Sequence, residues 1–290
     1  MRVAFLGLGL IGGSIAHALR TSRPGWTVAA WSPSGAGPAD ARDAGVVDVV
    51  AATAAHALDG AAIVVLAAPP SACLELIDEL AGSLRDHLDP AVTVTDVAST
   101  KAAIVARADA ARLRFVGGHP MAGRELSGFG AADPELFRDR PWIVVPGLHA
   151  GPADRSLVED LAAACGARPL PMTAADHDVA VAAISHLPLV VAAALVEAVA
   201  GGEGPPRPGW AAAAPLVAGG WRGTTRLARG DVEMGAGIAA TNPGPIAAGI
   251  RELRAVLDGW LTDLEQPGGP DEAAIRARLA AARRRLEEAG

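Results

Sequence analysis

The chain has 290 residues, of which 51% are hydrophobic and 20% are charged, a balance typical of a globular protein rather than a disordered one. Its net charge of -7, with no basic block before the last predicted helix, argues against a nucleic-acid partner. The two cysteines, Cys73 and Cys165, lack metal-ligand spacing and favour a reduced, cytoplasmic protein, while the length favours two domains.

The chain opens with a predicted strand, a glycine turn and a helix. Residues 3–8 form an apolar run typical of a buried parallel strand, and residues 11–19 have an apolar helical pattern. Between them lies Gly7-x-Gly9-x-x-Gly12, whose glycines allow a tight turn, the approach of a pyrophosphate and close packing of helix on strand. The N–H groups of Leu10 and Ile11 would bind the phosphates. The pattern predicts a dinucleotide site; the alternative is a glycine-rich turn without a ligand.

Residues 27–31 predict a second strand, which is followed by the position that reads the adenosine ribose. That position falls about twenty residues after the last glycine, at Ser32, with Ser34 close by. An acid there would bind the ribose 2′-hydroxyl and repel a 2′-phosphate, so its absence favours NADP over NAD, although only slightly. Arg42 is the nearest arginine on the next predicted helix, and it is more readily explained as a surface residue.

Further strands are predicted over residues 61–68, 92–97, 114–116 and 142–145, with helices over 71–84 and from about 99 to 108. Strands that alternate with helices predict an α/β fold with a doubly wound (Rossmann) parallel sheet, whose ligands bind beyond the carboxyl ends of the strands. The loops that fall at such ends carry the glycine turn, Ala68 and Pro69, Asp96 to Lys101, and residues 119–123. We therefore expect Ala68, Pro69, Asp96 and Lys101 beside the cofactor.

Beyond residue 150 the pattern becomes helical. A helix is expected over 156–165, an extended piece over 169–172, and helices from Thr173 onward, apart from loops at 201–209 and 219–223. We place a dinucleotide-binding domain at 1–150 and a helical substrate and dimerisation domain at 151–290. The apolar run 179–199 is long enough to span a membrane, but its polar residues favour a buried core helix. Those polar residues also argue against a membrane partner, and a half this apolar predicts a homodimer.

His119 is the strongest candidate for a catalytic residue. It follows two glycines at a strand end, and an imidazole can accept a proton as hydride leaves the same substrate carbon. His186 precedes a proline in an apolar helix, where a purely structural histidine is an equal alternative. Arg226 could clamp a carboxylate, or form a surface salt bridge. The remaining histidines, predicted to lie on the surface, are His17, His56, His87, His149 and His177. No cluster has metal-ligand spacing, so we expect no metal site.

Five segments together resemble the prephenate and arogenate dehydrogenases of tyrosine biosynthesis: residues 7–14, 96–101, 118–123 followed by Glu125, 185–188, and 223–226. The resemblance implies an oxidative decarboxylation. Hydride passes from the ring carbon that bears the hydroxyl to NAD or NADP, the ring carboxylate leaves as CO2, and the ring becomes aromatic. It also implies site residues: His119 would take the hydroxyl proton, Ser99 would bond near the same hydroxyl, Arg226 would hold a carboxylate, and His186, Thr225 and Glu125 would lie beside the substrate.

Two positions depart from many prephenate-preferring members. Leu189 replaces a histidine after Ser-His-Leu-Pro, and residues 233–237 lack a tryptophan. Both departures resemble the arogenate-type, NADP-using branch, so we lean slightly toward arogenate. Two other interpretations stay open. One is a β-hydroxyacid dehydrogenase, which would need a catalytic lysine in the helical half although the only lysine is Lys101. The other is a non-enzymatic, dinucleotide-binding dimeric sensor.

Overall fold

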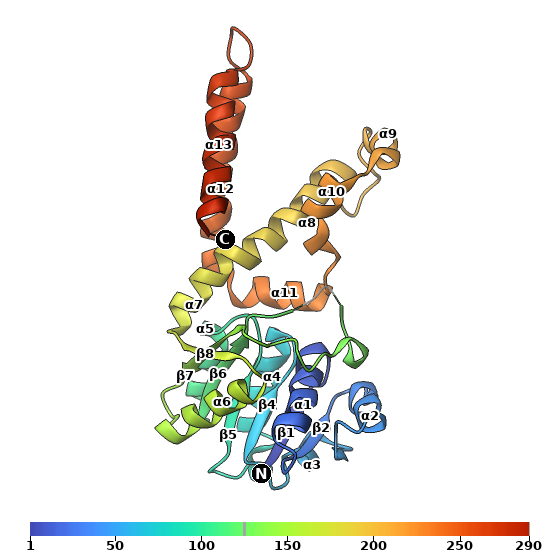
Figure 1. The fold of residues 1–290 in the computed structure, drawn as a ribbon, viewed down its shortest axis with the longest axis vertical. Coiled ribbons are helices and arrows are strands. Elements are labelled where there is room, and N and C mark those ends of the chain that lie inside the picture. The colour runs from blue at the N-terminus through green and yellow to red at the C-terminus, as the bar shows by residue number, and fades with distance from the viewer. Residues whose placement is uncertain (124–125, 290) are drawn as a thin grey trace. The chain divides into compact units, whose positions relative to one another are not determined.

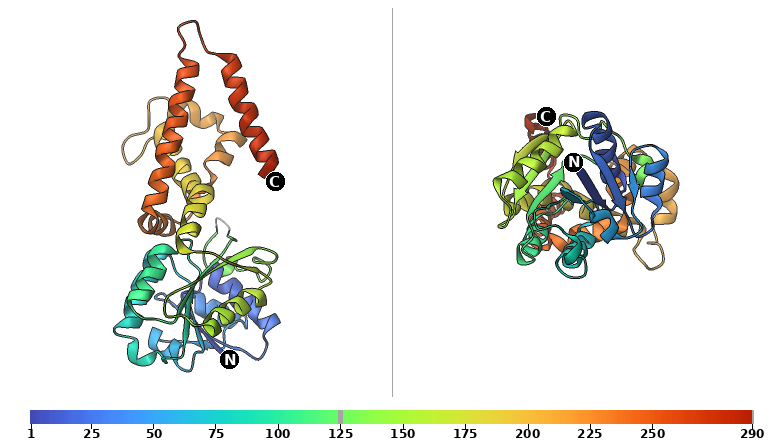
Figure 2. Two further views of the ribbon diagram at one scale, coloured as in Figure 1. Left: turned by 90° about the vertical axis from the view of Figure 1, so that its left-hand side faces the viewer. Right: turned by 90° about the horizontal axis from the view of Figure 1, so that it is seen from below.

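The computed structural model describes residues 1–123 and 126–289, and it contains an eight-stranded sheet flanked by helices on both faces (Figures 1 and 2). The strand order is β3-β2-β1-β4-β5-β6-β7-β8. The strands are β1 (Arg2–Leu6), β2 (Thr27–Trp31), β3 (Val49–Val50), β4 (Ile63–Leu66), β5 (Thr93–Asp96), β6 (Phe115–Pro120), β7 (Pro141–Pro146) and β8 (Arg168–Pro171). The predicted α/β fold with a helical C-terminal part is confirmed.

The side chains of each strand alternate between two buried apolar clusters, one on each face of the sheet. Phe5 on β1 packs with Ile15 on one face, whereas its neighbour Leu6 packs with Ile77 on the other. The helices between the strands are α1 (Leu10–Ser22), α2 (Ala36–Asp43), α3 (Ala54–Leu58), α4 (Pro70–Ala81), α5 (Ala102–Ala110) and α6 (Pro152–Ala164). These two cores hold β1 and β4–β6 in register, so that their carboxyl ends lie at one edge.

The predicted doubly wound parallel sheet is mostly parallel in the structure, with one antiparallel pair of strands, β6 and β7. Strands β1 to β6 are parallel, but β7 pairs with β6 in the antiparallel sense, with Pro120 opposite Trp142. A parallel neighbour needs a crossover that returns the chain to the other end of the sheet. The described part of the connection from β6 to β7 holds only a 3-10 turn, Phe129–Ala131, which packs on α1. Strand β7 therefore begins beside the carboxyl end of β6 and runs back in the opposite direction.

The sheet continues past residue 150. Helix α6 packs on β6 and β7, and β8 pairs in parallel with β7, so the last strand ends at Pro171. The sheet thus includes residues that the predicted boundary at 150/151 assigns to the second domain. Beyond it come α7 (Ala174–Val181), a π-helical turn (Ala182–His186), α8 (Leu187–Ala200), α9 (Trp210–Ala213), α10 (Gly219–Thr224) and α11 (Val232–Thr241). The loop expected at 219–223 is wrong, because α10 covers it.

The run from α7 to α8 is apolar and largely uncovered in a single chain. Ala174–Ala200 is the one helical segment among the described residues that is long and apolar enough to cross a membrane, by length and composition only, and 22% of its most apolar window is buried. The predicted buried core helix is therefore wrong for the isolated chain. Apolar surface of this extent is typical of a face that another protein surface covers.

Residues 244–290 form a separate compact unit. Its two helices are α12 (Pro243–Leu264) and α13 (Glu272–Ala289). Arg278 of α13 pairs with Asp263 of α12, and its guanidinium carbon lies 5.9 Å from the centre of the Trp260 ring. These contacts join the two helices into a hairpin.

Candidate active site

The glycine turn after β1 is built against the loop that follows β4. Gly7 has a φ of +92°, and a Cβ placed there would lie 2.4 Å from the carbonyl oxygen of Ala67. A Cβ on Gly12 would lie 2.9 Å from the Cβ of Ala67. Only glycine fits either position, since one needs a left-handed backbone and both need close approach. The absence of side chains lets the turn pack closely against Ala67 and the half-buried loop residues Ala68 and Pro69.

Gly9 differs from these two glycines because it faces open space. A Cβ built on Gly9 meets no described atom within 4 Å. Gly9 is also the N-cap of α1, and no side chain caps that end of the helix. The N–H groups of Leu10 and Ile11 in the first turn therefore point to a place where a phosphate fits. The residues present fit the pyrophosphate of a dinucleotide.

Ser32 and Ser34 lie in the turn that follows β2, beside the glycine turn. The end of β2 is tied to it, since the N–H of Gly7 donates to the carbonyl of Trp31 at 2.8 Å. The hydroxyl oxygen of Ser32 accepts from the N–H of Gly35 at 3.1 Å. Arg42 donates to the carbonyl of Asp48, which supports its interpretation as a surface residue.

Asp96 and Lys101 form a buried ion pair under this edge of the sheet. Both side chains have no exposed surface, and the Asp96 carboxylate also accepts from the N–H groups of Ala98 and Gly118, at 3.0 and 3.1 Å. The pair joins the end of β5 to β6 and to the start of α5. Both side chains therefore lie in the interior, where they support the loop between β5 and α5. Neither side chain exposes an atom that could contact a cofactor.

His119 lies near the end of β6, where its imidazole joins two residues of α7. Its Nδ1 is 2.8 Å from Nε2 of His177, and Nδ1 of His177 is 2.7 Å from an Asp178 carboxylate oxygen. His177 and Asp178 are 1% and 2% exposed, whereas His119 keeps some exposure to solvent. The prediction that His177 lies on the surface is wrong.

His186 is held in the same network from the π-helical turn. Its Nδ1 is 3.1 Å from the side-chain nitrogen of Asn242, which also donates to the carbonyl of Asp178. Its other ring nitrogen, Nε2, is buried, and the imidazole lies within hydrogen-bonding reach of the Ser99 backbone. Ser99 lies half-buried in the loop between β5 and α5, next to Thr100, whose hydroxyl is 2.8 Å from that of Thr241. The structure thus gathers His119, His186 and the Ser99 loop around α7 and the end of α11.

Burial favours the neutral form of both histidines. Loss of water contact lowers the pKa of His119 well below its usual value, and His177, Lys101 and His186 lower it further. Burial lowers the pKa of His186 to about 4, although Asp178 acts in the opposite direction. Asp178 is also partly desolvated, yet hydrogen bonds from His177 and two backbone N–H groups lower its pKa. The site therefore combines an ionised carboxylate with neutral imidazoles.

Sequence reasoning missed His177, Asp178 and Asn242. One signal was present: Asp178, Ala182 and His186 are spaced at i, i+4 and i+8, which places them on one helix face, and all three are buried. An acid on the same face as a histidine, in an otherwise apolar helix, indicates a shared polar site.

Thr225 and Arg226 are not part of this cluster in a single chain. Thr225 donates from its hydroxyl to the carbonyl of Trp221, and Arg226 begins a 3-10 turn that packs on α8. In Figure 1, α10 lies beside the distal half of α8, whereas α11 lies next to the sheet. Thr225 lines a cavity of about 240 Å³ with Trp210 and Trp221. Glu125 falls outside the described residues.

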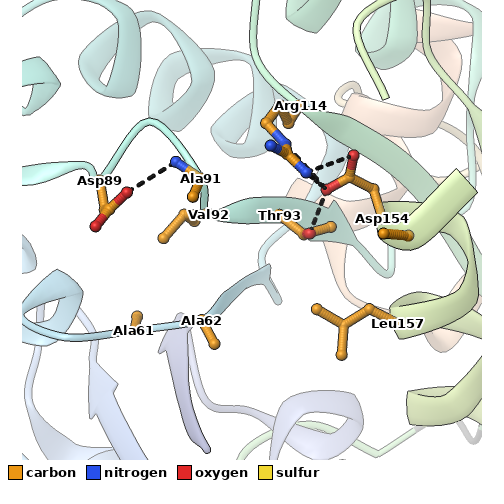
Figure 3. Close-up of a pocket in the computed structure, with 10 residues that line it drawn as sticks. Ala61, Ala62, Asp89, Ala91, Val92, Thr93, Arg114, Asp154 and Leu157 are labelled. Carbon is orange, nitrogen blue, oxygen red and sulfur yellow. Dashed lines mark hydrogen bonds and ion pairs between the residues drawn. The ribbon is translucent and has the colours of Figure 1, made fainter. Parts of the chain in front are cut away.

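A second cavity, of about 410 Å³, lies at the opposite edge of the sheet (Figure 3). It is lined by the residues that precede β4, β5 and β6, among them Ala62, Val92 and Arg114. Arg114 pairs with Asp154, which also accepts from the hydroxyl of Thr93 at 2.6 Å. Since ligands of such sheets bind at the carboxyl ends of the strands, this cavity is not the cofactor site.

Among the described residues, no group of three or more His, Cys, Asp or Glu side chains could hold a metal ion. Cys73 and Cys165 are free and buried, and burial raises the pKa of each thiol to about 12. Neither thiol is poised to act as a nucleophile or a metal ligand.

Comparison with known proteins identifies the family. A model described as the prephenate dehydrogenase nucleotide-binding domain matches residues 15–170, and one described as the prephenate dehydrogenase dimerization domain matches residues 173–267. A prephenate dehydrogenase from Bacillus subtilis is 34% identical over 271 residues, which cover 91% of this chain and 70% of that protein.

Two solved structures extend the likeness to the whole fold. Synechocystis arogenate dehydrogenase has a TM-score of 0.77 and 31% identity, covering 99% of this chain and 100% of the other. Prephenate dehydrogenase from A. aeolicus, in complex with hydroxyphenyl propionate and NAD+, has a TM-score of 0.85 and 25% identity, covering 99% and 98%. The chain belongs to the prephenate dehydrogenase family, as its sequence motifs predict, and is an NAD(P)-dependent dehydrogenase.

Proposed function

We propose that the chain oxidatively decarboxylates arogenate, with prephenate as the second candidate substrate, and that His119 is the base. The observation that carries this proposal is the place of His119. Its imidazole lies at the end of β6, at the sheet edge that holds the glycine turn, and keeps some exposure to solvent while its partners are buried.

The reaction fixes what the residues must do. A bound nicotinamide would supply the acceptor for the hydride that leaves the ring carbon bearing the hydroxyl. His119 takes the hydroxyl proton as the hydride leaves. The bond to the ring carboxylate then breaks, CO2 departs, and the electron pair of that bond completes the aromatic ring. His119 returns its proton to the ring oxygen, so that the protein ends in its starting state. Aromatisation supplies the driving force, and the protein mainly positions the reactants.

Other site residues hold the substrate in this proposal. Ser99 bonds near the ring hydroxyl, and His186, which lies beside the Ser99 backbone, shapes the substrate pocket. Arg226 holds a substrate carboxylate, and Thr225 and Glu125 lie beside the substrate. The dimerization domain matched over residues 173–267 supports a homodimer. The carboxylate role requires the segment around Arg226 to reach a substrate bound at His119.

Arogenate is favoured by Leu189, where many prephenate-preferring members carry a histidine. Leu189 is half-buried at the start of α8, three residues after the end of the π-helical turn. NADP is favoured slightly over NAD, because Ser32 replaces the acid that would repel a 2′-phosphate. We also propose a cytoplasmic location, with a small-molecule substrate and neither a nucleic acid nor a membrane as partner.

The direct test is steady-state reduction of NAD and of NADP with prephenate and with arogenate. We expect turnover with at least one of the four pairs, and a loss of about 10²–10⁴ in kcat for His119→Asn. The exposed His87→Asn is the matched control and should retain activity. Absence of turnover with all four pairs would refute the reaction, whereas an unchanged kcat in His119→Asn would refute only the base.

The cofactor is tested by Ser32→Asp. The new carboxylate should raise KM for NADP far more than for NAD, because only the former carries a 2′-phosphate to repel. Ser83→Asp places the same charge at an exposed position away from the turn and serves as control. Equal effects on both cofactors would show that residue 32 does not face the ribose.

A further inference from the structure

The imidazole of His119 is the outer member of a row of three polar groups. Behind it lies His177, whose Nε2 is 2.8 Å from Nδ1 of His119, and behind that Asp178, 2.7 Å from Nδ1 of His177. Only His119 keeps exposure to solvent, so the row runs from the accessible site into the interior.

Asp178 is held as an acceptor by the start of α5. One carboxylate oxygen accepts from the N–H of Lys101 at 2.7 Å, and the other accepts from the N–H of Ala102 at 2.8 Å. These donors, together with the positive end of the helix dipole, favour the ionised carboxylate. An ionised carboxylate can only accept, so the hydrogen between Asp178 and His177 belongs to Nδ1 of His177.

The position of this hydrogen determines which ring nitrogens of His177 and His119 carry the others. When His177 carries a single proton, on Nδ1, its Nε2 has a lone pair, and the contact between the two imidazoles then needs a donor from His119. That donor is Nδ1–H of His119. The other ring nitrogen of a neutral His119, Nε2, therefore carries a lone pair, which is the state that a base requires.

We propose that His177 and Asp178 are positioning residues that fix the tautomer of His119, so that Nε2 is the basic atom of the site. This inference rests on the proposed function, in which His119 takes the hydroxyl proton. When the proton arrives on Nε2, the positive charge on His119 is balanced through His177 by the carboxylate of Asp178. The proton stays on Nε2 of His119, and the same atom returns it to the ring oxygen.

Two substitutions at residue 177 separate positioning from mere packing. His177→Leu removes the acceptor for Nδ1–H of His119, whereas His177→Gln keeps a side-chain oxygen that can accept. We expect kcat to fall by about 10²–10⁴ in His177→Leu with a much smaller change in KM, and to recover at least about tenfold in His177→Gln. His87→Leu is the control at an exposed position, and thermal unfolding of each variant reports folding.

Nitrogen-15 NMR of histidine-labelled protein gives a readout that needs no turnover. The signals of His119, assigned by their loss in His119→Asn, should show a protonated Nδ1 and an unprotonated Nε2 in the wild type, and a shift toward protonated Nε2 in His177→Leu. A protonated Nε2 in the neutral wild type would overturn the proposal, as would an unchanged kcat in a folded His177→Leu. Absence of turnover in the wild type would refute the proposed function alone, because the tautomer is decided by NMR.

Discussion

Alanine substitutions at two glycines of the same turn should have different effects: one should lower stability and the other cofactor affinity. In Gly7→Ala the new residue must adopt a φ of +92°, which costs about 1–2 kcal/mol. Its Cβ would also lie 2.4 Å from the carbonyl oxygen of Ala67, so the turn and the neighbouring loop must separate. Such overpacking costs about 1–3 kcal/mol, and we expect a total loss of about 2–5 kcal/mol in the free energy of unfolding.

In Gly9→Ala the folded chain has no clash to relieve. The new Cβ meets no described atom within 4 Å, and φ is negative, at -97°. Loss of a glycine N-cap and the lower entropy of the unfolded chain nearly cancel, so stability should change by less than about 1 kcal/mol. The methyl group does occupy the space that a pyrophosphate needs, and we expect cofactor affinity to fall at least about 100-fold, equivalent to about 2.7 kcal/mol.

The assay pairs urea denaturation without cofactor with calorimetric titration of NAD and NADP. Gly25→Ala, an exposed glycine with no described atom near its Cβ, is the control for both measurements. Wild-type cofactor affinity in Gly9→Ala would refute the placement of the pyrophosphate. A loss of stability in Gly9→Ala as large as that in Gly7→Ala would refute the assignment of separate tasks to the two glycines.

Three further predictions test the residues that support the site. Lys101→Met should lower the free energy of unfolding by about 3–5 kcal/mol, since it leaves the Asp96 carboxylate buried without its partner; a loss under 1 kcal/mol in urea denaturation would contradict this. Thr100→Val should cost about 1 kcal/mol by removing its bond to Thr241, and a double-mutant cycle with Thr241→Val should give a coupling that two independent hydroxyls would not show. His186, whose pKa falls from 6.5 to about 4 on folding, should make stability decrease as pH falls between those values, because only the unfolded chain takes up the proton. His186→Gln should flatten that pH dependence, and an unchanged slope would assign it to other groups.

The carboxyl edge of the sheet could be predicted because its signals are local. The glycine spacing predicts a positive φ or a close approach; in the structure Gly7 shows both, and Gly12 shows the close approach. The direction of β7 has no such local signal, because residues 141–146 would have the same apolar pattern in a parallel or an antiparallel strand. Direction depends on the connection from β6, which lacks a crossover helix among its described residues.

The partners of His119 could not be predicted because their burial depends on tertiary contact. His177 and Asp178 are adjacent polar residues near the start of a helix, a pattern that usually indicates a solvated face. They are buried because that end of α7 packs against the start of α5, where backbone N–H groups need an acceptor. The apolar surface of α8 shows the reverse case: its composition predicts burial, which a single chain does not provide.

The burial of Lys101 has a practical consequence for experiments on this protein. It is the only lysine of the sequence, and its side chain has no exposed surface. Amine-reactive reagents will therefore find no lysine on the folded protein, and acylation of Lys101 will require the edge around Asp96 to open. The rate of that acylation, followed by mass spectrometry, measures how often this edge opens in the native protein, without any engineered label.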